Sequence, residues 1–90
     1  MLNDLHIKLY STPVCHACKA LKNELPKSNY KEYVEEVNLL ADDEEFKFAQ
    51  SKRILSVPTL YATYQGRECI ITGLRPISVI DDLITEFIRY

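Results

Sequence analysis

Two cysteines lie three residues apart in the segment Cys15-His16-Ala17-Cys18. This segment follows a short polar–apolar alternation and precedes a stretch with helical periodicity, so the first cysteine lies where a helix begins. Because an α-helix has about 3.6 residues per turn, side chains three apart lie on one face. Two thiols at that spacing can close a disulfide and open it again without moving the fold. The spacing therefore predicts a redox-active dithiol.

The beginning of a helix also favours the thiolate that such chemistry needs. Unpaired N–H groups and the positive end of the helix dipole face an anion there. Lowering a cysteine pKa from about 8.5 to about 7 takes roughly 2 kcal/mol. A helix terminus contributes about 0.3–1 kcal/mol and a charge-assisted hydrogen bond about 1.5–3 kcal/mol. We predict that Cys15 attacks a substrate disulfide and that Cys18, one turn later and nearer the apolar face, resolves the mixed disulfide.

The first half of the chain supplies the elements that position the dithiol. Residues 6–10 alternate and predict a strand, which Pro13 separates from the next element. A helix is expected from 14 to 25, stopped by Pro26, and a second strand over 33–40. The expected apolar face of that helix consists of Val14, Cys18, Leu21 and Leu25.

The second half predicts a helix, a hairpin and a last helix. Asp42 is expected to cap a helix, with Glu45 three positions on in capping-box register. Strands are expected over 57–64 and 68–72 around a turn at 65–67, and a helix from 77 to the C-terminus. The apolar face expected for the middle helix consists of Phe46, Ala49 and Ile54.

The resulting order is β-α-β-α-β-β-α, which predicts an α/β fold. A strand–helix–strand start requires a right-handed crossover and a parallel pair, whereas the later hairpin is antiparallel. We therefore expect a four-stranded mixed sheet covered by helices. Ninety residues leave room for one domain, spanning 1–90.

Composition excludes several classes of protein. The formal charge is −2, from 11 Lys and Arg against 13 Asp and Glu, so no basic surface for nucleic acid or for anionic membranes is expected. No apolar run approaches the roughly 20 residues of a membrane span, and the N-terminus shows no secretory signal. Three cysteines cannot form a closed disulfide framework. We expect a monomeric cytoplasmic protein without bound metal or cofactor.

The cysteine motif after a strand, together with Val57-Pro58-Thr59 before a hairpin, resembles the thioredoxin superfamily. Residues 54–74 are similar to thioredoxin proper, whereas the short N-terminus is more like that of a glutaredoxin. The resemblance covers nearly the whole chain and implies a thioredoxin-like fold.

The resemblance also implies a function and further site residues. The Val57–Pro58 bond is expected to be cis, and Val57, Pro58, Thr59, Gly73 and His16 are expected to form the substrate-binding surface. The implied activity is thiol–disulfide exchange with protein disulfides, including that of ribonucleotide reductase. The implied reductant is either a thioredoxin reductase or glutathione.

Departures from the family leave several alternatives open. No proline separates the cysteines, and His16 is either a protonated group that favours the thiolate or an exposed neutral side chain. The family's buried aspartate would fall at about Leu9, so proton transfer to and from Cys18 uses water, Glu36 or no specific group. The glutaredoxin Gly-Gly for glutathione is missing, although Lys52 and Arg53 could meet its carboxylates.

Other functions remain as alternatives to a protein-disulfide reductase. A glutathione-dependent glutaredoxin is one, and an iron–sulfur-binding glutaredoxin-like protein is another. A structural zinc site lacks a second cysteine pair, since only Cys69, His6 and His16 remain as soft ligands. Cys69 is expected to act as a small hydrophobic residue in a strand. The last alternative is a non-catalytic interaction module with the same fold.

Overall fold

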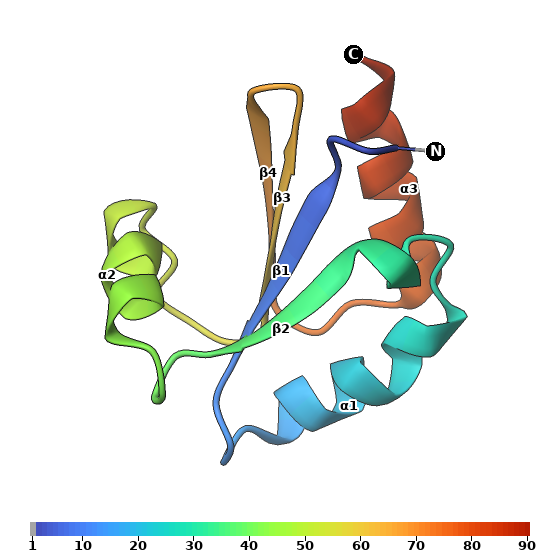
Figure 1. Ribbon diagram of the computed structural model, residues 1–90. Coiled ribbons are helices and arrows are strands. Elements are labelled where there is room, and N and C mark those ends of the chain that lie inside the picture. The colour runs from blue at the N-terminus through green and yellow to red at the C-terminus, as the bar shows by residue number, and fades with distance from the viewer. Residues whose placement is uncertain (1) are drawn as a thin grey trace.

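The computed structural model describes residues 2–90 and places one sheet between two layers of helix (Figure 1). One face of the sheet carries α2, and the other carries α1 and α3. The elements in chain order are β1 (His6–Ser11), α1 (His16–Glu24), β2 (Val34–Asn38), α2 (Asp43–Ser51), β3 (Thr59–Tyr64), β4 (Arg67–Thr72) and α3 (Ile77–Arg89). This order confirms the α/β prediction.

The sheet has the strand order β2-β1-β3-β4. β1 pairs with β2 in parallel, and β3 is antiparallel to both β1 and β4, so the sheet is mixed, as predicted. Gln65 and Gly66 form the hairpin turn, with φ of 50° and 78°. Positive φ at both central residues is typical of a two-residue hairpin turn, because its twist matches that of the flanking strands. Arg67, expected in the turn, is the first residue of β4.

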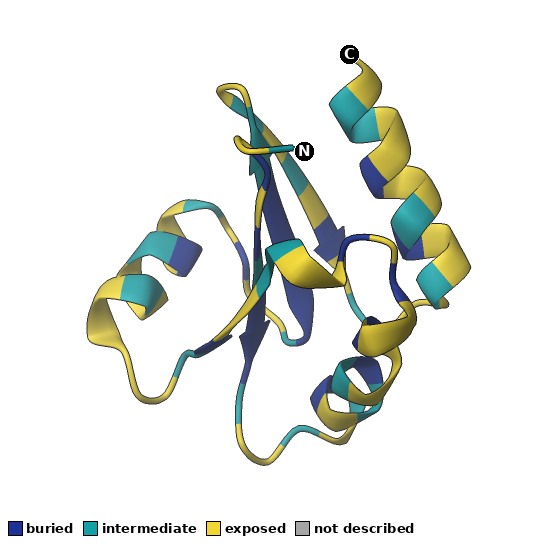
Figure 2. Ribbon diagram, turned by 45° about the vertical axis from the view of Figure 1, so that its right-hand side comes forward, coloured by how far each residue is buried: buried dark blue, intermediate teal, exposed yellow. Residues whose placement is uncertain are grey.

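Alternation along the strands separates the core into two clusters, which appear as the dark interior of Figure 2. Ile7 and Leu9 of β1 belong to the cluster under α1 and α3, and Tyr10 belongs to the cluster under α2. The first cluster consists of Leu5, Ile7, Leu9, Leu21, Leu25, Tyr30, Leu60, Ala62, Ile71, Ile80 and Ile84. The second consists of Tyr10, Val37, Ala49, Ile54 and Tyr61.

The expected start of the first helix at Val14 is wrong. Val14 is 85% exposed and lies in the loop before Cys15, which is the N-cap residue of α1. The rest of the predicted face is correct, because Cys18, Leu21 and Leu25 are buried. Pro26 ends the α-helix as expected and lies in a 3-10 turn at Leu25–Lys27.

The predicted second strand was too long at both ends. Tyr33 belongs to a 3-10 turn at Lys31–Tyr33, and Leu40 is exposed in the loop after β2. Similarly, β3 begins at Thr59 rather than at residue 57, because Pro58 has no N–H for the ladder. In both cases the prediction included apolar residues that only flank the strand.

The α2 cap is confirmed, but the face of this helix differs from the prediction. Asp42 Oδ1 accepts a hydrogen bond from the Glu45 N–H at 3.1 Å. Phe46 is partly exposed, whereas Phe48 packs edge-on against the Tyr61 ring at 5.5 Å between centroids. Ile54 is buried but lies beyond the end of the helix. No helix within residues 2–90 is both long enough and apolar enough to cross a bilayer.

Candidate active site

Cys15 caps the N-terminus of α1 with its own sulfur. Its backbone is extended, with φ of −108° and ψ of 109°, and its Sγ accepts a hydrogen bond from the Cys18 N–H at 3.1 Å. No acidic residue lies in the first turn of α1. The orphan N–H groups and the helix dipole therefore stabilise negative charge on this sulfur once it is reduced.

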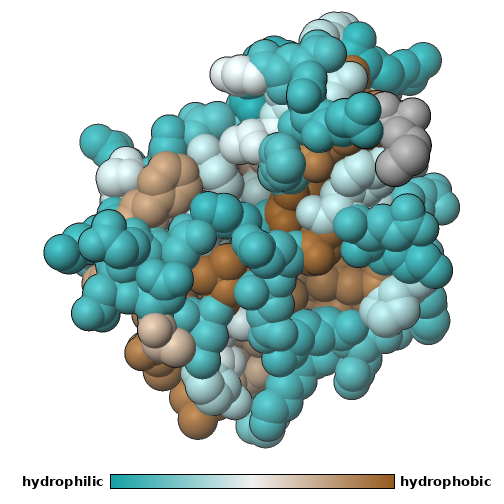
Figure 3. All heavy atoms as spheres, viewed as in Figure 1, coloured by the Kyte–Doolittle hydropathy of each residue, from teal (hydrophilic) through white to brown (hydrophobic). Residues whose placement is uncertain are grey.

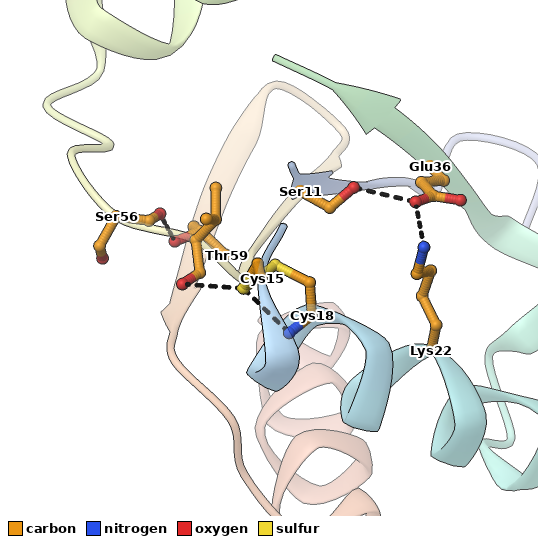
Figure 4. Close-up of a disulfide and its surroundings, with 8 residues drawn as sticks. Ser11, Cys15, Cys18, Lys22, Glu36, Ser56 and Thr59 are labelled. Carbon is orange, nitrogen blue, oxygen red and sulfur yellow. Dashed lines mark hydrogen bonds and ion pairs between the residues drawn. A yellow bond between two sulfur atoms is a disulfide. The ribbon is translucent and has the colours of Figure 1, made fainter. Parts of the chain in front are cut away.

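The two sulfurs form a disulfide with a Cα–Cα distance of 5.2 Å (Figure 4). Cys15 is partly exposed, whereas Cys18 is completely buried against the sheet. A substrate can therefore reach Cys15 but not Cys18. This difference in access agrees with the predicted roles of attacking and resolving cysteine.

The loop before β3 meets the dithiol. The Val57–Pro58 bond is cis, as expected, and the Val57 carbonyl oxygen lies 3.9 Å from Cys15 Sγ. Pro58 is buried, and its carbonyl oxygen accepts a hydrogen bond from the Gly73 N–H at 2.8 Å. The loop before β3 thus contacts both Cys15 and the residue that follows β4.

Gly73 is suited to this position by its backbone and by the space beside it. Its φ of +88° is a conformation that side chains with a Cβ rarely adopt, and a Cβ there would meet no atom within 4 Å. The space next to Pro58 is therefore open on the Gly73 side.

The remaining predicted substrate-binding residues differ in exposure. His16 is exposed at the first position of α1. Thr59 is buried, and its hydroxyl donates to the Ser56 carbonyl oxygen at 2.8 Å, as Figure 4 shows. The Thr59 side chain therefore supports the loop from inside, and a role of Thr59 in substrate binding stays a prediction.

Glu36 lies on the other side of the disulfide in Figure 4. Its Oε2 accepts hydrogen bonds from Ser11 Oγ at 2.9 Å and from Lys22 Nζ at 2.8 Å. These two partners, Lys22 first, hold the Glu36 pKa below its usual value, so the carboxyl group is ionised. A carboxylate with a lowered pKa is a weak base, and Lys22 offsets the negative charge of Glu36.

Sequence reasoning considered Glu36 but missed Ser11 and Lys22. One available signal was that Lys22 follows Cys18 by four residues and so lies on the same side of α1. Ser11 continues the alternation of Ile7 and Leu9 and therefore points to the α1 side of β1. Leu9 is buried and is paired with Glu36 across the strands.

One of the two cations considered for glutathione already has an anionic partner. Lys52 Nζ lies 2.6 Å from Glu68 Oε2, and Arg53 is exposed with φ of 59° in the turn after α2. A ligand carboxylate would have to compete with Glu68 for Lys52 or share it.

Cys69 is a free thiol on β4, partly buried against the core beneath α3. Burial raises the pKa of this thiol, which opposes thiolate formation at neutral pH. Among residues 2–90, no three His, Cys, Asp or Glu side chains lie close enough to share a metal ion.

No protein-family model and no curated protein sequence matches the chain. Solved structures do match it. A mutant thioredoxin from Halobacterium salinarum has a TM-score of 0.76 and 21% identity, with 93% of this chain and 74% of that chain covered.

Two further structures give the same result. Thioredoxin from Trypanosoma brucei brucei has a TM-score of 0.74 and 19% identity, with 96% of this chain and 76% of that chain covered. Oxidised mitochondrial thioredoxin 3 from Saccharomyces cerevisiae has a TM-score of 0.71 and 17% identity, with coverages of 91% and 78%. Together with the element order and the mixed sheet, these likenesses show that the chain has the thioredoxin fold.

Proposed function

We propose that the chain is a thiol–disulfide oxidoreductase that reduces protein disulfides, with Cys15 as the nucleophile and Cys18 as the resolving cysteine. The observation that carries this proposal is the position of the Cys15 sulfur. It caps a helix, accepts the Cys18 N–H at 3.1 Å and is linked to Cys18 in a disulfide. The thioredoxin fold around this pair supports the same activity.

The reaction has two exchange steps. In the first, the Cys15 thiolate attacks one sulfur of the substrate disulfide, which forms a mixed disulfide and releases the other substrate sulfur as a thiolate. In the second, Cys18 loses its proton and attacks Cys15 Sγ, which closes the Cys15–Cys18 disulfide and releases the second substrate thiolate. The substrate gains two electrons, and the dithiol loses them.

Another turnover requires a reductant that returns two electrons and two protons to the disulfide. We propose a thioredoxin reductase or glutathione for this step, in a cytoplasm whose redox poise keeps thiols reduced. Ribonucleotide reductase is a proposed client, on the basis of the sequence resemblance alone. The engaged Lys52 favours the reductase over glutathione.

A turnover assay with a disulfide-bonded protein substrate tests the proposal. The protein is supplied with NADPH and thioredoxin reductase in one arm, and with glutathione and glutathione reductase in the other. We expect NADPH consumption in the reductase arm. The replacement Cys15→Ser should abolish it, and Cys18→Ser should accumulate a mixed disulfide that mass spectrometry detects.

Cys69→Ser is the matched control, because Cys69 makes no disulfide and lies on β4. It should retain turnover. Turnover in Cys15→Ser equal to that of the unchanged protein would overturn the proposal. Partner binding without any redox activity would favour the non-catalytic module instead.

A further inference from the structure

One edge of the sheet is open to another strand. Within residues 2–90, β2 lies at the end of the strand order and pairs only with β1, in front of which it crosses in Figure 1. The Leu39 N–H, just after β2, donates to the Ser11 carbonyl oxygen at 3.0 Å and so points towards β1. Backbone groups alternate in direction along a strand, so the N–H and C=O groups of Glu36 point away from the sheet. Such groups form hydrogen bonds with an added extended segment.

A groove of about 490 Å³ lies on the α1 side of this edge, between β2, the end of α1 and the turns that connect them. Its apolar lining consists of Leu9, Leu25, Pro26 and Val34. Its rim carries two cations and two anions, which are Lys22, Lys31, Glu32 and Glu36. Figure 3, in the same view as Figure 1, shows brown apolar surface between hydrophilic side chains near the middle. This side of the edge therefore favours an uncharged apolar side chain.

The α2 side of the same edge is acidic. Two hollows of about 350 and 390 Å³ lie on this side, and Glu35 lines both, whereas Asp42 and Glu45 line the smaller one. Lys8 pairs with Glu45 at 2.8 Å. Glu35 and Asp42 form no ion pair within residues 2–90. Their uncompensated negative charge attracts a basic side chain.

The two sides together define the segment that fits. Successive side chains of a strand point to opposite faces of the sheet. A strand added beside β2 therefore directs every second side chain into the apolar groove and the others towards Glu35. A second copy of this chain fits poorly, because antiparallel pairing about the middle of β2 would place the two Glu36 carboxylates directly opposite each other.

We propose that the β2 edge binds an extended segment of a partner polypeptide in which apolar and basic residues alternate. The segment continues the sheet through backbone hydrogen bonds to Glu36, with its apolar side chains over Val34 and Leu25 and its basic side chains beside Glu35. β1 separates β2 from β3, so this surface is distinct from the cis-proline loop at Cys15. Binding at this edge goes beyond the proposed function and requires no disulfide exchange.

The test titrates the protein with short capped peptides that contain no cysteine. One peptide alternates Val and Lys, the second alternates Val and Glu, and the third alternates Ser and Lys. NMR shifts of the β2 amides locate the binding and give the Kd of each peptide. We expect the Kd of the Val–Lys peptide to be lower than that of either other peptide by about 10-fold or more.

Methylation of peptide nitrogens tests the backbone hydrogen bonds. In an added strand, alternate N–H groups face β2 and the others face solvent. Methyl groups on all Val nitrogens and on all Lys nitrogens of the Val–Lys peptide therefore block opposite edges. The two methylated peptides should differ in Kd by about 5-fold or more, since only one of them loses hydrogen bonds to β2.

Charge reversal at the edge tests the acidic side. Glu35→Lys should raise the Kd of the Val–Lys peptide by about 5-fold or more and lower that of the Val–Glu peptide. Asp82→Lys makes the same charge change at an exposed position of α3 and should leave both Kd values within about 2-fold. Circular dichroism checks that each variant is folded. If Glu35→Lys does not fold, Glu35→Gln replaces it and should shift both Kd values in the same directions.

The outcomes separate this inference from the proposed function. Equal Kd values for the three peptides, equal effects of the two methylations, or shifts confined to residues away from β2 would overturn it. Shifts of the β2 amides that follow protein concentration instead of peptide concentration would identify a second copy as the occupant and would also overturn it. Peptide binding at β2 without any disulfide reduction would contradict the proposed function alone.

Discussion

The two halves of the candidate site are supported by different kinds of contact. The dithiol helix α1 packs on a cluster of 11 buried residues shared with α3. The segment that leads to Pro58 follows α2, which packs on a cluster of only five. The α2 side compensates for its small apolar cluster with hydrogen bonds and ion pairs.

The first of these polar contacts joins β1 to the beginning of α2. Glu45 accepts a hydrogen bond from the Tyr10 hydroxyl at 3.0 Å and pairs with Lys8 Nζ at 2.8 Å. The sequence predicted Glu45 as the second half of a capping box, in which its side chain would bind the N-cap backbone. In the structure its carboxylate holds α2 against the sheet instead.

The second contact follows the same pattern at the other end of α2. Glu68 accepts a hydrogen bond from the Tyr61 hydroxyl and pairs with Lys52. The Phe48 ring lies within reach of both lysines, with Lys8 Nζ 5.1 Å and Lys52 Nζ 5.7 Å from its centroid. Each end of α2 therefore has a tyrosine, a glutamate and a lysine in contact.

Apolar burial does not depend on pH, whereas contacts between tyrosine, glutamate and lysine do. The α1 side should therefore respond most to lost volume, and the α2 side to lost hydrogen bonds and to pH. Four measurements test this difference between the two sides.

We expect the largest loss in the free energy of unfolding from a cavity beneath α3. Ile84→Ala should lower the free energy of unfolding by about 2–5 kcal/mol, because Ile84 is 1% exposed in the large cluster. Urea unfolding of the reduced protein measures it. Val79→Ala on the same helix, where Val79 is partly exposed, is the control and should cost far less. Equal losses would show that α3 is not held by burial.

Alkaline pH should weaken the α2 side. Burial and the hydrogen bond to Glu68 raise the pKa of Tyr61 to about 12, and burial with Glu45 raises the pKa of Tyr10 as well. The unfolded tyrosines ionise near their ordinary pKa of about 10, while the folded ones stay neutral. The stabilisation is thus complete below about pH 10 and is lost as the pH rises through the folded pKa.

Denaturant unfolding between about pH 9 and 11 measures how steeply the free energy of unfolding falls with pH. This range brackets the ordinary tyrosine pKa of about 10. Tyr61→Phe should flatten the slope, and Tyr90→Phe, at an exposed tyrosine, should not. If Tyr61→Phe leaves the slope unchanged, the predicted pH dependence of the α2 side is wrong.

The α2 cap should have a moderate effect. Asp42→Ala removes the side chain that accepts the Glu45 N–H and should cost about 1 kcal/mol in the free energy of unfolding. Asp43→Ala, in the exposed first turn of the same helix, is the control and should cost a few tenths of a kcal/mol at most. Thermal unfolding compares the two. A larger loss in Asp43→Ala would contradict the assignment of Asp42 as the cap.

The smallest effect is expected at Glu36, which makes a polar contact on the α1 side. Its pKa is lowered, so its stabilisation is present above about pH 4.3 and is lost as the pH falls through the folded pKa. Because the Lys22–Glu36 pair is partly exposed, Glu36→Gln should cost less than about 1 kcal/mol at pH 7. Acid titration should show a shallower loss of stability in Glu36→Gln than in the unchanged protein.

Most elements followed from local pattern, and the errors share one physical cause. Leu9 and Tyr10 alternate between faces, Asp42 caps a helix, and Pro26 stops one, all of which are effects of neighbouring residues. Val14 and Phe46 were assigned to apolar helix faces and Leu40 to a strand because they are apolar, yet all three are exposed. Hydropathy alone does not distinguish a residue that packs in the core from one exposed beside the site.

In the candidate site, too, local features were predicted correctly, whereas local pattern did not predict contacts between distant segments. The spacing of Cys15 and Cys18 before a helix was sufficient to predict a dithiol, since a helix turn and its N-terminal N–H groups are local properties. The approach of Val57 to Cys15 joins residues 42 positions apart. The Ser11–Glu36–Lys22 contacts likewise join separate segments. Only the packing of the sheet and its helices decides such contacts, because they depend on how distant segments meet in space.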